Sequence, residues 1–152
     1  MSTQSTHLFK LRLERTIRAP RTRVFEAFTN PDDLARWSAP EGAEVAGGET
    51  DLRVGGRWSV LMRALEGGTE YHATGEYREI VPPERLVYTH RWLTDPTPIE
   101  TLVTVEFHDA GDSTRLVMIH EGFQSESVRD GHAAGWSSCF DKLEGLLGDE
   151  TT

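Results

Sequence analysis

The chain has 152 residues and a formal net charge of −9, with 16 Lys and Arg residues against 25 Asp and Glu residues. This length is enough for one domain with a substantial core. The acidic balance argues against a nucleic-acid partner, because phosphate contacts need clustered basic side chains. No apolar run approaches the roughly 20 residues of a membrane span, and residues 1–7 lack the apolar centre of a signal peptide. We therefore expect a cytoplasmic protein without membrane insertion.

The first third of the chain predicts one strand followed by two short helices. Residues 8–17 alternate apolar and mostly charged side chains, as in a strand with one face in solvent. Pro20 suits the first position of a helix, and Asn30 ends that helix because a residue before proline avoids the helical region. Asn30 can also cap a second helix, which delivers Leu34 and Trp37.

The middle of the chain predicts six further strands joined by short connections. Residues 38–49 show no clear pattern and are expected to form a loop. The strands are expected at residues 50–54, 57–64, 69–81, 85–93, 100–108 and 114–122. Glycine pairs, a proline pair and the segment 109–113 supply the turns. Consecutive strands with short connections predict an antiparallel meander, and with the first strand the sheet has seven strands.

The segment 125–148 predicts a long helix with one apolar stripe. The stripe consists of Val128, Trp136, Cys139, Phe140, Leu143 and Leu147. Gly131 and Gly135 occupy positions where a solidly packed helix would carry side chains, so we expect a glycine-interrupted helix above a cavity of roughly 300–1,000 Å³. Cys139 is expected to be a small buried hydrophobe. The domain is expected to cover residues 8–148, with flexible ends at 1–7 and 149–152.

A series of short motifs runs in order along the chain. They are Ala19-Pro20, Val24-Phe25, Asn30-Pro31, Gly55-Gly56-Arg57-Trp58, Gly75-Glu76-Tyr77, Pro82-Pro83-Glu84-Arg85, Thr114-Arg115-Leu116, His120-Glu121-Gly122-Phe123 and Gly135-Trp136. Over residues 8–147 this set resembles domains homologous to the activator of Hsp90 ATPase, of the START-like, helix-grip superfamily. The resemblance implies an α+β helix-grip fold, in which a curved antiparallel sheet and a long C-terminal helix enclose a cavity. It implies no single function, because members of the superfamily bind lipids, hormones or polyketides and some cyclise polyketides.

Alternation within the predicted strands selects the side chains that face the cavity. The hairpin between 100–108 and 114–122 is predicted to pair Val103 with His120, and His90 is expected to face Val103 from the other side. The next, deeper row is expected to contain Tyr88, Val105 and Met118. Two histidines on alternate strands stand about 9–10 Å apart at the backbone. This is wide for two ligands of one metal ion, whose Zn–N bonds are about 2.1 Å, so we expect groups that flank a ligand and no metal site.

The predicted ligand contacts combine these rows with the aromatic residues and with His132, which is expected to complete the cluster from the long helix. They are Trp37, Trp58, Met62, Tyr88, His90, Trp92, Val103, Met118, His120, His132, Trp136 and Phe140. His90, His120 and the tryptophans have a structural alternative, since inward histidines are often hydrogen-bonded core residues and tryptophans often fill the core. Four tryptophans in a chain of this size nevertheless suit a flat apolar ligand.

The sequence contains no nucleophile motif, phosphate-binding loop or paired carboxylates of the glycosidase kind. It favours binding of a small hydrophobic molecule, lipid- or polyketide-like, with no catalytic residue and no cofactor. The first alternative is a polyketide cyclase or dehydratase in which His90 or His120 acts as general acid or base. The second is a module that contacts the Hsp90 chaperone, but the outward strand faces lack the apolar patch that this needs. The sequence indicates neither the ligand, the pathway nor the oligomeric state.

Overall fold

The computed structural model describes residues 8–96 and 98–150. In chain order the elements are β1 (Phe9–Ile17), α1 (Arg21–Thr29), α2 (Pro31–Trp37), β2 (Ala43–Thr50), β3 (Arg57–Ala64), β4 (Glu70–Val81), β5 (Arg85–Trp92), β6 (Thr101–Ala110), β7 (Ser113–Phe123) and α3 (Glu126–Glu150). The predicted α+β fold, with a curved seven-stranded antiparallel sheet, two short helices and a long C-terminal helix, is confirmed. The ends predicted to be flexible at 1–7 and 151–152 lie outside the described residues.

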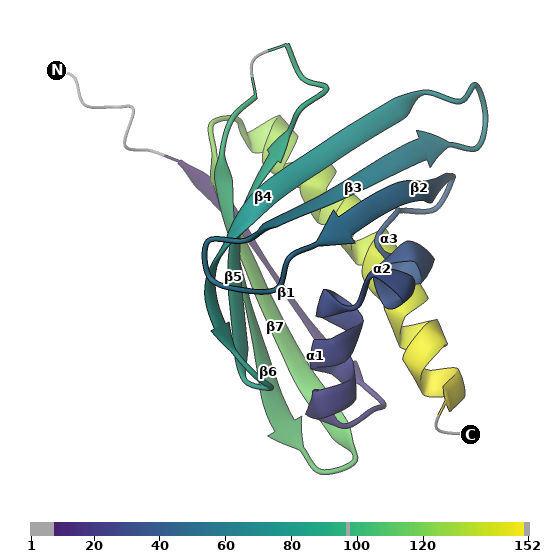
Figure 1. The fold of residues 1–152 in the computed structure, drawn as a ribbon, viewed down its shortest axis with the longest axis vertical. Coiled ribbons are helices and arrows are strands. Elements are labelled where there is room, and N and C mark those ends of the chain that lie inside the picture. The colour runs from purple at the N-terminus through teal and green to yellow at the C-terminus, as the bar shows by residue number, and fades with distance from the viewer. Residues whose placement is uncertain (1–7, 97, 151–152) are drawn as a thin grey trace, which may run out of the picture.

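The sheet has the strand order β1-β7-β6-β5-β4-β3-β2, with every neighbouring pair antiparallel. Strands β2 to β7 follow one another, and β1 pairs with β7 at the edge opposite β2. Figure 1 shows the sheet bent around α3, with α1 and α2 beside the C-terminal half of that helix. Irregular pairing in β1, β2 and β4 contributes to the bend, because a bulge increases the local twist of a strand.

Strand β2 lies earlier in the chain than predicted. The sequence predicts a loop at 38–49 and a strand at 50–54, but β2 spans Ala43–Thr50 and residues 51–56 form the connection to β3. The prediction is wrong because two glycines and two glutamates give this segment a low strand propensity, which pairing with β3 overrides. At Gly48 a Cβ atom would lie 2.6 Å from the carbonyl oxygen of Ser59, so the glycine permits the close approach of the two strands.

Helix α3 is one uninterrupted helix of 25 residues, so the predicted interruption by glycine is wrong. Each glycine costs only about 1 kcal/mol relative to alanine, and burial of one face of α3 offsets this cost. Its buried residues are Cys139, Phe140, Leu143 and Leu147. Val128, which was assigned to the same stripe, is 49% exposed. The helix continues to Glu150, two residues beyond the predicted end of the domain at 148.

The two short helices begin and end close to the predicted positions. Pro20 is the N-cap of α1, with an extended backbone, and is therefore one residue outside the predicted first helical position. Asn30 ends α1 and caps α2 as predicted, because its side-chain oxygen accepts a hydrogen bond from the backbone nitrogen of Asp32 at 2.8 Å. This shared residue fixes the sharp change of direction between the helices.

The apolar core is densest where α1, α2, β6 and α3 meet. The ring of Phe28 lies at its centre, with ring centroids 4.7 Å from Trp37, 5.4 Å from Phe107 and 6.2 Å from Phe140. The indole nitrogen of Trp37 donates a hydrogen bond to the carbonyl of Ala27 at 2.8 Å. This cluster ties both short helices to the sheet and to α3.

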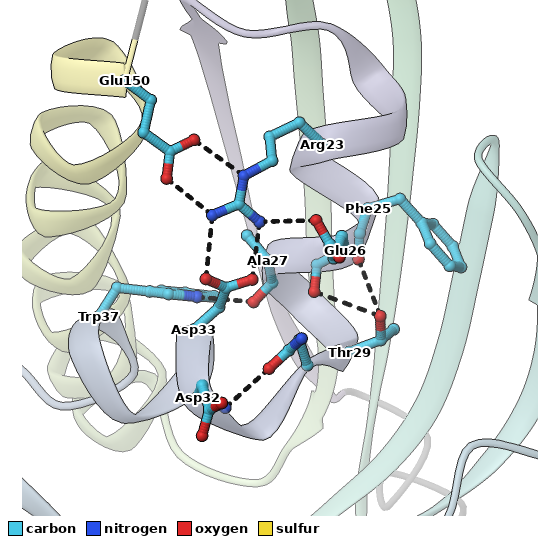
Figure 2. Close-up of polar contacts among 10 residues, drawn as sticks. Arg23, Phe25, Glu26, Ala27, Thr29, Asp32, Asp33, Trp37 and Glu150 are labelled. Atoms are coloured by element: carbon cyan, nitrogen blue, oxygen red, sulfur yellow. Dashed lines mark hydrogen bonds and ion pairs between the residues drawn. The ribbon is translucent and has the colours of Figure 1, made fainter.

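A cluster of charged side chains joins the same three helices (Figure 2). Arg23 donates to both carboxylate oxygens of Asp33 at 2.7 and 3.0 Å, and to those of Glu150 at 2.8 Å each. Hydrogen bonds to Glu150 and Asp33 raise the pKa of Arg23, and the hydrogen bond from Arg23 lowers the pKa of Glu150. Arg23 therefore connects the end of α3 to α1 and α2.

We expect Arg23→Met to lower the free energy of unfolding by about 2 kcal/mol. The substitution leaves the carboxylate of Asp33, which is 8% exposed, without its cation. Breaking a fully buried ion pair costs about 3–5 kcal/mol, and we reduce this value because Glu150 is partly solvated. Urea denaturation measures the loss. Arg12→Met is the control, because Arg12 and Glu14 form an exposed pair worth about 0–1 kcal/mol. Equal losses in the two variants would contradict the prediction.

Candidate ligand-binding cavity

A cavity of about 500 Å³ lies between the sheet and α3. This volume falls within the range that the sequence predicts. Its walls come from β3, β4, β5 and the first half of α3, and from residues in and around α1 and α2. Among the described residues that line it there is no Asp, Glu, Lys or Arg, and most are apolar or aromatic. Tyr71 and Val128, which are 46% and 49% exposed, lie where the cavity meets solvent.

Seven of the twelve predicted ligand contacts line this cavity. They are Trp58, Met62, Tyr88, His90, Trp92, His132 and Trp136. Those on the sheet come from β3 and β5, and alternation within each strand places them on the same face. Gly131 and Gly135 also line the cavity, and a Cβ atom at either position would meet no atom within 4 Å outside its own helix turn. The open space beneath α3 is therefore located where the sequence predicts it.

The other five predicted contacts belong to the core and do not line the cavity. They are Trp37, Val103, Met118, His120 and Phe140, each exposed by 1% or less. The prediction that Met118 and His120 point into the cavity is therefore wrong. The reason is the position of the helices, because α3 packs over β1 and β7, and α1 packs over β6 and β7. The cavity remains over the other half of the sheet, above β3, β4 and β5.

One of the two predicted strand registers is correct. In the β6–β7 hairpin Val103 pairs with His120, as predicted. Between β5 and β6, however, His90 pairs with Thr101, and it is Tyr88 that pairs with Val103. The predicted register is therefore displaced by two residues. A shift of two leaves every side chain on its predicted face, so alternation alone cannot distinguish the two registers.

Three imidazole rings gather at one end of the cavity, next to Trp92 and the start of α3. The ring centroids of His90 and His120 are 5.2 Å apart, those of His120 and His132 5.5 Å, and those of His90 and His132 6.1 Å. The predicted wide separation is wrong for the rings, because side chains on the concave face of a curved sheet converge. In the described part of the chain, no group of three or more His, Cys, Asp or Glu side chains is arranged to hold a metal ion.

His120 is fully hydrogen-bonded within the protein. Its Nδ1 accepts from the indole nitrogen of Trp136 at 3.0 Å, and its Nε2 lies 2.6 Å from Oγ1 of Thr101. The hydroxyl of Thr101 donates to the carbonyl of His90 at 3.0 Å, so Nε2 of His120 carries the proton that Thr101 accepts. Burial, with smaller effects from His90 and His132, lowers the pKa of His120 to about 2. His120 is therefore a neutral core residue that positions Trp136.

His132 is also satisfied by protein groups. Its Nε2 accepts a hydrogen bond from the indole nitrogen of Trp92 at 2.9 Å. Its Nδ1 lies 2.9 Å from the carbonyl oxygen of Val128, one turn earlier in α3, and donates to it. An indole can only donate, so both nitrogens of His132 have defined roles. The contact between Trp92 and His132 fixes the start of α3 to the end of β5.

His90 differs from the other two histidines. It is 6% exposed and lines the cavity, and no group among residues 8–96 and 98–150 forms a hydrogen bond with either of its ring nitrogens. Its neighbours are aromatic, with ring centroids at 5.1 Å for Trp92 and 5.5 Å for Trp58. Burial, and secondly His132, lowers the pKa of His90 to about 3, so the ring is neutral. The two ring nitrogens of His90, one a donor and the other an acceptor, therefore remain available to a ligand.

Sequence reasoning missed part of the lining contributed by β4. Tyr71, Ala73 and Tyr77 line the cavity, on the same face as Gly75. The signal was present, because these residues alternate with the more polar Glu70, His72, Thr74 and Glu76. Burial raises the pKa of Tyr77 to about 12 and raises that of Tyr88 further. No described residue forms a hydrogen bond with either hydroxyl group.

Comparison with known proteins places the fold in a family. The family described as "Activator of Hsp90 ATPase homolog 1-like protein" matches residues 18–148. The chain belongs to this AHSA1 family. The family lies within the START-like, helix-grip superfamily, so the resemblance noted in the sequence is confirmed. No match was found among proteins with curated descriptions.

Several solved structures share the AHSA1 fold of this chain. A protein from Chromobacterium violaceum is 30% identical, with a TM-score of 0.82 over 91% of this chain and 96% of that chain. The AHSA1 protein from Silicibacter pomeroyi is 27% identical, with a TM-score of 0.82 over 93% and 99%. A protein from Rhizobium loti is 29% identical, with a TM-score of 0.71 over 93% and 98%. Within the described part of this AHSA1 chain, no helix is both long and apolar enough to cross a membrane.

Proposed function

We propose that this AHSA1 protein binds a small apolar or aromatic molecule in the cavity between the sheet and α3. The observation that carries the proposal is a cavity of about 500 Å³ whose lining is mainly apolar and free of charged side chains among the described residues. Such cavities are the common form of small-molecule sites. Trp58, Trp92 and Trp136 contribute flat apolar surfaces, which favour a ligand with rings.

The side chains of the cavity favour binding over catalysis. An effective general base has a pKa near the working pH, and burial holds His90 far below it. Burial likewise raises the pKa of the Cys139 thiol to about 12, so the reactive thiolate is scarce at neutral pH. Neither His90 nor Cys139 is thus prepared for acid–base or nucleophilic chemistry. Formation of a detectable product when the protein is incubated with a polyketide-like molecule would instead favour the cyclase alternative.

We expect Gly135→Leu to weaken binding of the neutral dye Nile red by about tenfold or more, because a leucine side chain at this position extends into the cavity. Gly145→Leu is the matched control, since Gly145 lies on the same helix, is exposed and does not line the cavity. Fluorescence titration measures both dissociation constants, and circular dichroism confirms folding. Equal dye binding by the two variants would place the dye elsewhere and contradict the proposed site.

A further inference from the structure

We propose that the ligand carries one uncharged hydrogen-bonding group, a hydroxyl or a carbonyl, which binds the imidazole of His90 while the remainder of the ligand contacts the apolar walls. The inference rests on the proposed function and adds the chemical class of the ligand. Three features of the cavity support it: the hydrogen bonds of its polar groups, the absence of charge in its lining and the order of groups around His90.

The other imidazole and indole rings around His90 are already paired. The indole nitrogen of Trp58 donates to the carbonyl of Thr89 at 3.1 Å, and that of Trp92 donates to His132. His120 is held by Trp136 and Thr101, as described above. A buried imidazole without a partner is costly, and native proteins pair such groups with protein, water or ligand atoms. His90 is therefore the ring of this cluster whose nitrogens are free to bind a ligand.

The absence of charge in the lining indicates an uncharged partner for His90. No described lining residue can neutralise a carboxylate, phosphate or ammonium group. Transfer of an unpaired ion into such surroundings is strongly unfavourable. A neutral imidazole offers one donor and one acceptor, which matches a hydroxyl group in either direction or a carbonyl group as acceptor.

The positions of neighbouring groups also orient the ligand. The ring of His90 lies between Trp58 and Trp92, so a polar atom that reaches it is bordered by aromatic surfaces. Tyr88 lies two residues earlier on the same face of β5, and its hydroxyl group can bind a second polar atom. Met62 and Tyr71 line the cavity from β3 and β4, and Tyr71 lies at the opening. The polar atom of the ligand therefore lies between these two tryptophans, and its apolar body contacts the walls formed by β3 and β4.

A series of three probes tests the inference: pyrene, hydroxypyrene and pyrenecarboxylate, which share one ring system and differ in the polar group. We expect wild-type protein to bind hydroxypyrene about three- to tenfold more tightly than pyrene, as one net hydrogen bond provides. The carboxylate is expected to bind at least about tenfold more weakly than the hydroxyl compound. His90→Phe should remove the preference for hydroxypyrene over pyrene. His90→Gln keeps a donor and an acceptor at this position and should retain part of the preference for hydroxypyrene.

The control variant is His108→Phe, which replaces an exposed histidine outside the cavity and should leave all three affinities unchanged. Equal wild-type affinities for pyrene and hydroxypyrene would overturn the inference, even if His90→Phe failed to fold. Survival of the preference in folded His90→Phe would overturn it too. In both cases binding of pyrene itself would leave the proposed function intact. Absence of binding by every probe, Nile red included, would overturn the proposed function and this inference together.

Discussion

Gly75→Ala is expected to lower the free energy of unfolding by about 4 kcal/mol or more, an unusually large effect for the addition of one methyl group. A Cβ atom at Gly75 would lie 1.7 Å from the carbonyl oxygen of Thr89 and 2.5 Å from the indole nitrogen of Trp58. These two atoms form a hydrogen bond of 3.1 Å across the glycine. The methyl group must therefore separate β4 from β5 or displace Trp58, and either change breaks the hydrogen bond.

Urea denaturation measures this effect, and Gly47→Ala is the matched control. Gly47 lies in β2, and a Cβ atom there would meet nothing within 4 Å. The control is therefore expected to change stability by less than about 1 kcal/mol, in the stabilising direction. A loss below about 1 kcal/mol for Gly75→Ala would show that the sheet adjusts around the methyl group. Because Trp58 also contacts the ring of His90, the variant should weaken Nile red binding as well.

Acidification from pH 7 to pH 5 is expected to lower the free energy of unfolding by about 4 kcal/mol through two buried histidines. Burial lowers the pKa of His90 to about 3 and that of His120 to about 2, against an ordinary value of 6.5. Below pH 6.5 the unfolded chain therefore binds protons that the folded protein does not, so stability decreases as the pH falls. Each histidine contributes about 2 kcal/mol over this interval by linkage.

Urea denaturation of wild type and His90→Phe at the two pH values isolates one of these contributions. The decrease in stability between pH 7 and pH 5 is expected to be about 2 kcal/mol smaller in His90→Phe, because one buried titrating group has been removed. The same pH dependence in the two proteins would show that His90 is protonated in the folded state at pH 5.

The faces of the strands could be predicted from the sequence because side chains alternate along a strand. Trp58, Met62, Tyr88, His90 and Trp92 line the cavity as expected from this period of two. The β6–β7 register was also predictable, because a short turn at residues 111–112 leaves little freedom in pairing. The cap at Asn30 could also be predicted, because the side chain that accepts the hydrogen bond and the backbone nitrogen that donates it are neighbours in the chain.

Other features depended on contacts between distant segments. Strand β2 forms because β3 accepts it as a partner, although its own residues disfavour a strand. Strands β5 and β6 are joined by a longer connection, residues 93–100. Its sequence does not distinguish between registers that differ by two residues, so the β5–β6 register could not be predicted. The extent of the cavity also depended on the helices, because α3 and α1 pack over β1, β6 and β7 and leave β3 to β5 open.

The roles of the three histidines likewise depend partly on the sequence and partly on the tertiary structure. Their presence on inward positions follows from alternation and helical period, which are properties of the sequence itself. Their hydrogen-bond partners do not, because Trp136 reaches His120 from α3, and His132 of the same helix accepts from Trp92 of β5. Only the placement of α3 across the sheet pairs these groups and leaves His90 without a partner among the described residues. The sequence thus determined which polar groups face inward, and the tertiary structure decided which of them can bind a ligand.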